Sequence, residues 1–130
     1  LSLDDLKAKA NAACTSAAGP VDALVQVPAS DTYFGNMQLV ASVDVSGSDA
    51  LDTIGTWLKG LSGPHSGALI VMGRNDEVTA ATLRGALHRL PRDPARAPSS
   101  VCFVGDAKDA PGLKAAAEKT GVTVYTVQAS

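Results

Sequence analysis

Apolar segments of strand length alternate along this 130-residue chain with segments of helical periodicity, and this alternation constrains the fold most. Residues 68–72 and 101–104 are continuous apolar runs, which are typical of strands buried on both faces. Residues 37–45 and 122–127 alternate between apolar and polar positions, which predicts two further strands. Residues 21–27 alternate in the same way, although a helix beginning near Pro20 is a competing interpretation.

Helical spacing of apolar residues predicts the remaining elements. Ser2 and Asp5 form a capping-box pattern at the start of an N-terminal helix, and Gly19 and Pro20 end it. Further helices are predicted at about 51–61, 79–90 and 109–121. The first helix, within residues 1–19, has a thin apolar face. It is expected to pack on the edge of the domain or to continue a helix from an upstream part.

Successive strand–helix–strand units require right-handed crossovers and a mostly parallel sheet. We therefore predict one α/β domain over residues 1–130, a Rossmann-like three-layer sandwich around a mainly parallel sheet of about five strands. A hydrophobic content of 45% and a charged content of 18% agree with a globular domain.

The charge and hydropathy of the chain exclude several classes of partner. A formal net charge of −2 gives no electrostatic reason to expect nucleic acid or an anionic membrane. No apolar run approaches the roughly 18 residues that a membrane-spanning helix needs. The chain begins at Leu1, which suggests a processed protein or an excised domain, and the compartment stays undetermined.

The two cysteines, Cys14 and Cys102, lie far apart in the sequence. The simpler interpretation is a pair of unpaired thiols, with Cys102 as a small core residue. The alternative is a disulfide that ties the N-terminal segment to the sheet in an oxidising compartment. No Cys-x-x-Cys motif or paired histidine accompanies them, so a metal site at the cysteines is not expected.

Ligands of parallel α/β sheets bind beyond the carboxyl ends of the strands. The predicted elements place four segments at that edge: 44–48, 73–78, 105–109 and the residues after 127. The first of them reads Asp-x-Ser-x-Ser, with Asp44, Ser46 and Ser48 at alternate positions. Carboxylate and hydroxyl oxygens suit a hard cation such as Mg²⁺, so these residues are candidate metal ligands.

An apolar strand that ends in Asp-x-Ser-x-Ser, here LVASVDVSGS, resembles the opening strand and metal-ion-dependent adhesion site of von Willebrand factor A domains. The resemblance implies a Mg²⁺ site that is completed by Thr79 and Asp106, and a role in binding proteins. It extends over residues 37–127, where the closing GLKAAAEKTGVTVYTV also looks like the family's last helix and strand.

Helix capping offers a second interpretation of the same turn. Ser46 is followed three residues later by Asp49, and serine at a helix start stabilises the helix by about 1 kcal/mol without any metal. Capping leaves Asp44 unexplained, because an acid at the end of a buried strand needs a partner. Both interpretations therefore stay open.

The remaining polar residues suggest binding more than catalysis. Four arginines form a basic strip that is typical of a solvated face or of a surface for anions or an acidic partner: Arg84, Arg89, Arg92 and Arg96. His65 and His88 lack a Ser–Asp arrangement, Trp57 is expected to pack at an edge, and no phosphate-binding or nucleophile-elbow motif occurs. The sequence predicts a non-enzymatic protein-binding or assembly module of a larger protein or complex, with a small enzyme or a domain for anionic small ligands as the alternative.

Overall fold

The computed structural model describes residues 2–60, 65–92 and 98–128. Its centre is a sheet of four strands: β1 (Val21–Val27), β2 (Ala68–Gly73), β3 (Ser99–Val104) and β4 (Val122–Val127). All three neighbouring pairs are parallel, and the strands lie in chain order, β1-β2-β3-β4. The parallel α/β architecture, which is compatible with a Rossmann-like fold, is therefore confirmed.

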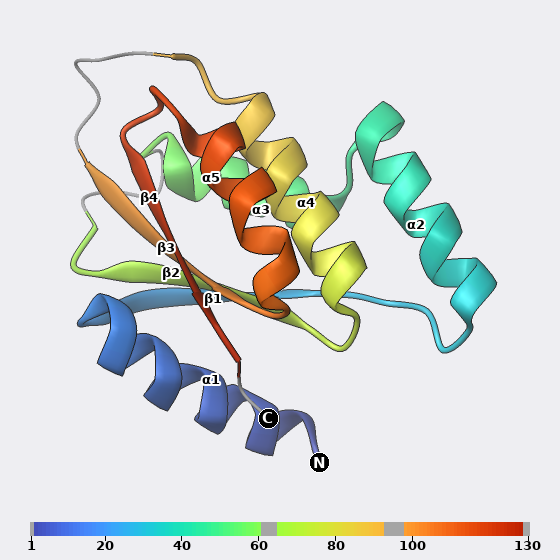
Figure 1. Cartoon of the computed structure of the whole chain (residues 1–130), viewed down its shortest axis with the longest axis horizontal. Coiled ribbons are helices and arrows are strands. Elements are labelled where there is room, and N and C mark those ends of the chain that lie inside the picture. Colours follow the sequence, from blue (N-terminus) through green and yellow to red (C-terminus); the bar gives the residue numbers. More distant parts are fainter. Residues whose placement is uncertain (1, 61–64, 93–97, 129–130) are drawn as a thin grey trace.

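Strand order decides where the helices lie. Each right-handed crossover advances the chain by one strand in the same direction, so every connection returns over the same face of the sheet. That face is covered by α3 (Asp49–Leu58), α4 (Asp76–His88) and α5 (Ala110–Ala117), with a short 3₁₀ turn, Ala107–Asp109, before α5. The opposite face is covered by α1 (Leu3–Ala18), as Figure 1 shows.

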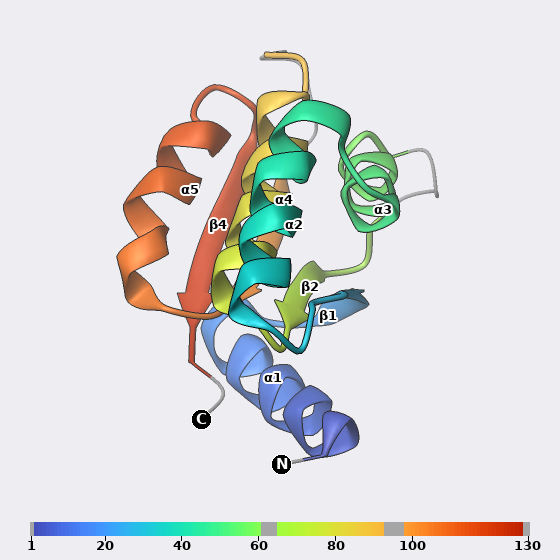
Figure 2. The same ribbon diagram turned by 90° about the vertical axis from the view of Figure 1, so that its right-hand side faces the viewer.

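Helix α2 (Tyr33–Ser46) stands apart from both layers. It lies outside α4 and packs against that helix rather than on the sheet, as Figures 1 and 2 show. Gly85 permits the close approach, because a Cβ there would lie 2.8 Å from Leu51 of α3 and 3.6 Å from Val43 of α2. Of the residues in α2, Val43 alone is buried.

The predicted strand at 37–45 is wrong, because this segment belongs to α2, and the sheet consequently has four strands rather than about five. The Thr32 side chain caps the helix by accepting the Gly35 amide hydrogen bond at 3.0 Å. Leu39, Val40 and Val43 then face α4 with helical spacing. The segment is apolar on nearly every side, so its sequence fits a strand period and a helix period equally well.

The other predicted elements are present. The strands at 21–27, 68–72, 101–104 and 122–127 are confirmed, and so is the capping box of α1. Helix α4 begins at Asp76, one turn earlier than predicted, because Asn75 caps it. No helix in the described part of the chain is both long enough and apolar enough to cross a membrane.

Cys14 and Cys102 form a disulfide that joins α1 to β3, so the simpler expectation of two unpaired thiols is wrong. Both residues are fully buried in the smaller of two cores, which α1 makes with one face of the sheet. Ile70, Met72 and Val104 supply the sheet side of this core. The larger core fills the space between the other face and the α3–α5 layer, around Phe103.

Reduction of the disulfide should therefore destabilise the domain. The bond closes a loop with a sequence separation of 88 residues, and such cross-links stabilise proteins by about 2–4 kcal/mol, chiefly by restricting the unfolded chain. Thermal unfolding with and without dithiothreitol, followed by far-ultraviolet circular dichroism, measures the effect. A melting temperature that is unchanged after mass spectrometry has verified full reduction would contradict it.

Candidate functional site

The Asp-x-Ser-x-Ser segment forms a helix–helix junction and not a strand–helix turn. Asp44 and Ser46 lie in the last turn of α2, and Gly47 ends that helix with φ = 76°. The Ser48 hydroxyl accepts a hydrogen bond from the Leu51 amide at 3.2 Å and caps α3. A serine of this segment thus caps the helix, but it is Ser48 and not Ser46, because Ser46 is still part of α2. Asp44 needs no special partner because it is exposed on a helix.

Thr79 and Asp106, the two predicted distant ligands, lie elsewhere. Thr79 is buried in the first turn of α4, where its hydroxyl donates to the Asn75 carbonyl at 2.8 Å. The Asp106 carboxylate accepts the Lys108 amide hydrogen bond at 2.9 Å and caps the 3₁₀ turn. Thr79 is thus engaged in a local side-chain-to-backbone bond at the start of α4, whose cap is Asn75, and Asp106 in capping the 3₁₀ turn.

Helix α4 separates the two groups. The junction at Ser46–Ser48 lies beside Arg89, since a Cβ on Gly47 would lie 2.9 Å from that guanidinium. Arg89 follows Thr79 by ten positions, or roughly 15 Å along a helix. The structure therefore does not bring Asp44, Ser46, Ser48, Thr79 and Asp106 together. Among the residues that it describes, no group of three or more His, Cys, Asp or Glu side chains could hold a metal ion.

Two arginines of the predicted basic strip are exposed but donate hydrogen bonds to backbone carbonyls at helix ends. Arg89 donates to the Val43 carbonyl at the end of α2 at 3.4 Å. Arg92 donates to the Ala116 and Glu118 carbonyls at the end of α5 at 2.7 and 2.8 Å. Guanidinium groups at helix carboxyl ends donate to terminal carbonyls and interact favourably with the negative end of the helix dipole. Arg84 is half-buried beside Asp109, and Arg96 lies outside the described residues.

The carboxyl edge of the sheet does carry a hollow, of about 370 Å³. Two of the predicted edge segments, 73–78 and 105–109, border it, and the start of α2 closes the third side. The lining side chains include acids, bases and exposed apolar groups: Tyr33, Asn36, Met37, Arg74, Asn75, Asp76, Glu77, Asp106 and Lys108. Acids outnumber bases here, which makes the hollow a poor receptor for an anion.

The acids around this edge crowd one another. Burial, followed by the negative charges of Asp106 and Asp109, raises the pKa of Asp76 above its ordinary value. Burial also raises the pKa of Asp109, against the opposing charge of Lys108. Lys108 is itself paired with Glu77 at 3.6 Å, so it neutralises only part of the negative charge.

The Asp106→Asn substitution should lower the pKa of Asp76, because it removes one of the charges that raise that value. The pKa should stay somewhat above its ordinary range, since burial, the larger cause, is unchanged. Carboxyl-detected NMR titration of the wild type and the variant measures the shift. The control is the Asp44→Asn variant, which changes a residue of α2 that lies near the far end of α4 from Asp76. An Asp76 titration identical in all three proteins would refute the coupling.

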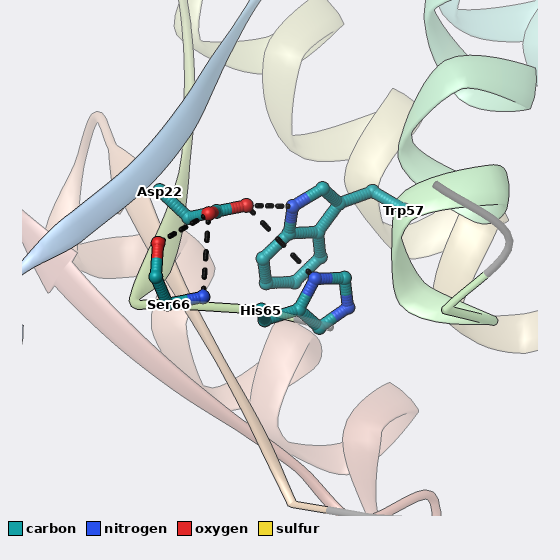
Figure 3. A network of polar contacts seen from close by, with 4 residues as sticks. All are labelled: Asp22, Trp57, His65 and Ser66. Carbon is teal, nitrogen blue, oxygen red and sulfur yellow. Dashed lines mark hydrogen bonds and ion pairs between the residues drawn. The ribbon is translucent and has the colours of Figure 1, made fainter. Parts of the chain in front are cut away.

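A second polar cluster, which sequence reasoning missed, lies at the amino ends of β1 and β2 (Figure 3). The Asp22 carboxylate accepts hydrogen bonds from the Trp57 indole at 2.8 Å and from the Ser66 hydroxyl at 2.7 Å. His65 stacks on Trp57 with ring centroids 3.6 Å apart, and its Nδ1 lies 3.9 Å from Asp22. The signal in the sequence was an acid, Asp22, inside a strand whose only other polar residue is Gln26.

This cluster combines Ser, His and Asp, but its geometry is not that of a nucleophilic triad. The Ser66 hydroxyl donates to the carboxylate and not to the imidazole, so no base is placed to activate it. Trp57 is only 6% exposed and ties α3 to β1 through Asp22. The cluster is therefore a structural clamp between an edge strand and the helix layer.

A scan against models of protein families, and searches of curated proteins and of solved structures, found no match to this chain. The resemblance to von Willebrand factor A domains therefore stays a prediction. The strand that opens that resemblance, at 37–45, is helical in the structure.

The Asp22 clamp should make the domain sensitive to acid. Hydrogen bonds from Ser66 and Trp57 lower the pKa of Asp22, so the ionised form is favoured in the folded state. This contribution to stability is present above the unfolded pKa, about 3.9, and is lost as pH falls through the folded value. Asp22→Asn should destabilise the domain at pH 7 and cost much less near about pH 2.

Urea unfolding followed by circular dichroism at both pH values measures the difference, with Asp31→Asn, altered at an exposed aspartate, as the control. Equal destabilisation by Asp22→Asn at the two pH values would contradict the assignment.

Proposed function

We propose that this domain is a non-enzymatic protein-binding module of a larger protein or complex, and that the outward face of α2 is its docking surface. One observation carries the proposal. The large hydrophobic side chains that are exposed in the described structure, Tyr33, Phe34, Met37 and Val45, all belong to α2.

Helical spacing gathers three of these side chains into one stripe. Phe34, Met37, Ala41 and Val45 follow the pattern i, i+3, i+7 and i+11, which places them on one face of the helix. Phe34 is 67% exposed and Val45 is 84% exposed. Leu39, Val40 and Val43 occupy the opposite face and pack on the core. A surface helix ordinarily presents polar residues outward, so the apolar outer stripe of α2 favours a partner.

The spacing and the charge around the stripe indicate the kind of partner. Intervals of three and four residues match the seam of a second helix packed alongside. Helix α2 contains no lysine or arginine, Asp31 precedes it, and Asp44 lies in its last turn. The partner that fits best is an amphipathic helix with an apolar seam and basic flanks. Aromatic and methionine side chains, which are enriched in protein interfaces, supply the contact.

The alternative function, recognition of an anionic small molecule at the carboxyl edge, has weaker support. The hollow there is lined by Asp76, Glu77 and Asp106, and their charges oppose an anion. Arg89 and Arg92, which were predicted to attract one, donate to helix carbonyls instead.

Photo-crosslinking tests the docking surface directly. Benzoylphenylalanine at position 34 preserves the aromatic character and, in the cell that makes the protein, should crosslink a distinct partner. The same residue at Thr53, exposed on α3, is the control and should not. The partner is then purified, and its affinity for the domain is measured by calorimetry.

With that partner, Phe34→Asp should weaken binding by about 100-fold or more, as for a central apolar contact. The melting temperature of the free domain should hardly change, because the side chain is largely exposed. Equal crosslinking of the partner from positions 34 and 53 would refute the proposal, and so would an unchanged affinity of the Phe34→Asp variant.

A further inference from the structure

The two edges of the sheet differ in how they are protected. β1 carries a register irregularity between Val21 and Ala23, contains Asp22, and lies between Pro20 and Pro28. Irregular pairing, charge and proline are the usual devices that stop an edge strand from pairing with another chain. β4, VTVYTV, has none of them: it contains no charge and no proline, and its six residues pair with β3 in unbroken register.

The outer side of β4 presents unused backbone groups. The Gly121 and Val127 carbonyls accept hydrogen bonds from the Ser99 and Gly105 amides of the β3 side, at 3.1 and 2.9 Å. Because backbone groups alternate in direction along a strand, the N–H and C=O groups of the odd-numbered residues of β4 point toward β3. Val124 and Thr126 therefore direct their N–H and C=O groups outward. Val122 directs its C=O outward, whereas its N–H donates to the Thr120 hydroxyl at 3.1 Å. In the described structure β4 is an edge strand of the sheet and pairs with β3 on its inner side.

Space for another strand lies beside this edge. A groove of about 410 Å³ runs along the first half of β4 and is bordered by the end of α5, with Lys114 and Glu118 on its rim. Val122 and Val124 form its floor together with Thr123. An extended backbone laid in this groove would reach the outward groups of β4.

We propose that β4 pairs with β4 of a second copy of this chain, antiparallel, about a twofold axis at Val124. In this register Val124 lies opposite its own copy and Val122 lies opposite Thr126. The two Val124 residues can exchange both of their backbone hydrogen bonds, and each Thr126 N–H can donate to the Val122 carbonyl of the other copy. The four-stranded sheet becomes continuous across the dimer.

The sequence of β4 is self-complementary in that register. Every pair on one side of the sheet joins β-branched residues, and on the other side Thr123 lies opposite Tyr125. Aromatic and β-branched residues are favourable cross-strand partners. No like charges meet within the strand pair, because β4 carries none, and the charged residues beside the groove, Lys114, Glu118 and Lys119, lie outside the paired strands. An identical strand is thus the occupant that fits best, and a closed twofold pair leaves no further β4 edge open.

Sedimentation equilibrium from about 1 to about 500 µM tests the dimer, a range that covers dissociation constants typical of weak to moderate association. The wild type should sediment at twice its 13.2 kDa as concentration rises. Thr123→Lys changes an exposed side chain and sets two lysines diagonally across the axis, so the dissociation constant should rise by at least tenfold. Thr53→Lys, on α3, is the matched control and should behave as the wild type.

Thr126→Pro provides an independent second variant, since it removes an outward N–H that makes no bond to β3 and should also give a monomer. Circular dichroism verifies the fold of each variant. A wild type that stays monomeric over the whole range overturns the proposal, as does a dimer that Thr123→Lys leaves intact. A dimer that is dissociated by Phe34→Asp instead would assign self-association to α2 and not to β4, and would overturn the proposal independently of the partner experiment.

Discussion

The order of the strands is the constraint on which the rest of the structure depends. With β1 to β4 arranged in chain order and parallel, every right-handed crossover returns over the same face, and α3, α4 and α5 gather there. The other face receives no crossover helix. It would leave Ile70, Met72 and Val104 in water if α1 did not cover them. The disulfide between Cys14 and Cys102 fastens that cover to the sheet.

Much of this architecture could be predicted from the sequence, because strands such as 68–72 and 101–104 are apolar over a length that suits only a buried strand. The segment at 37–45 could not be assigned from its pattern. Its outward side carries Phe34, Met37 and Val45 among a few polar residues, which weakens the polar face that distinguishes a surface helix from a strand. The error and the proposed function thus have the same physical origin: a helix with apolar side chains on both sides.

The candidate site was harder to predict than the fold, since it depended on that one segment. With α2 helical, Asp44 and Ser46 lie at the far end of α4 from Thr79 and Asp106. The arginines were recognised as a group, but the carbonyls that Arg89 and Arg92 bind belong to helices distant in sequence. The Asp22 clamp likewise joins residues 35 and 44 positions apart, which no local pattern reveals.

The conformation of residues 33–46 is the central claim, because the proposed docking surface depends on it. Backbone chemical shifts and nuclear Overhauser effects from NMR measure that conformation, and a soluble paramagnetic agent reports the exposure of side chains. The account predicts helical shifts, contacts between residues three positions apart, and strong broadening of Phe34, Met37 and Val45. Extended shifts with cross-strand contacts to a neighbouring strand, or protection of those three side chains in the isolated domain, would contradict it.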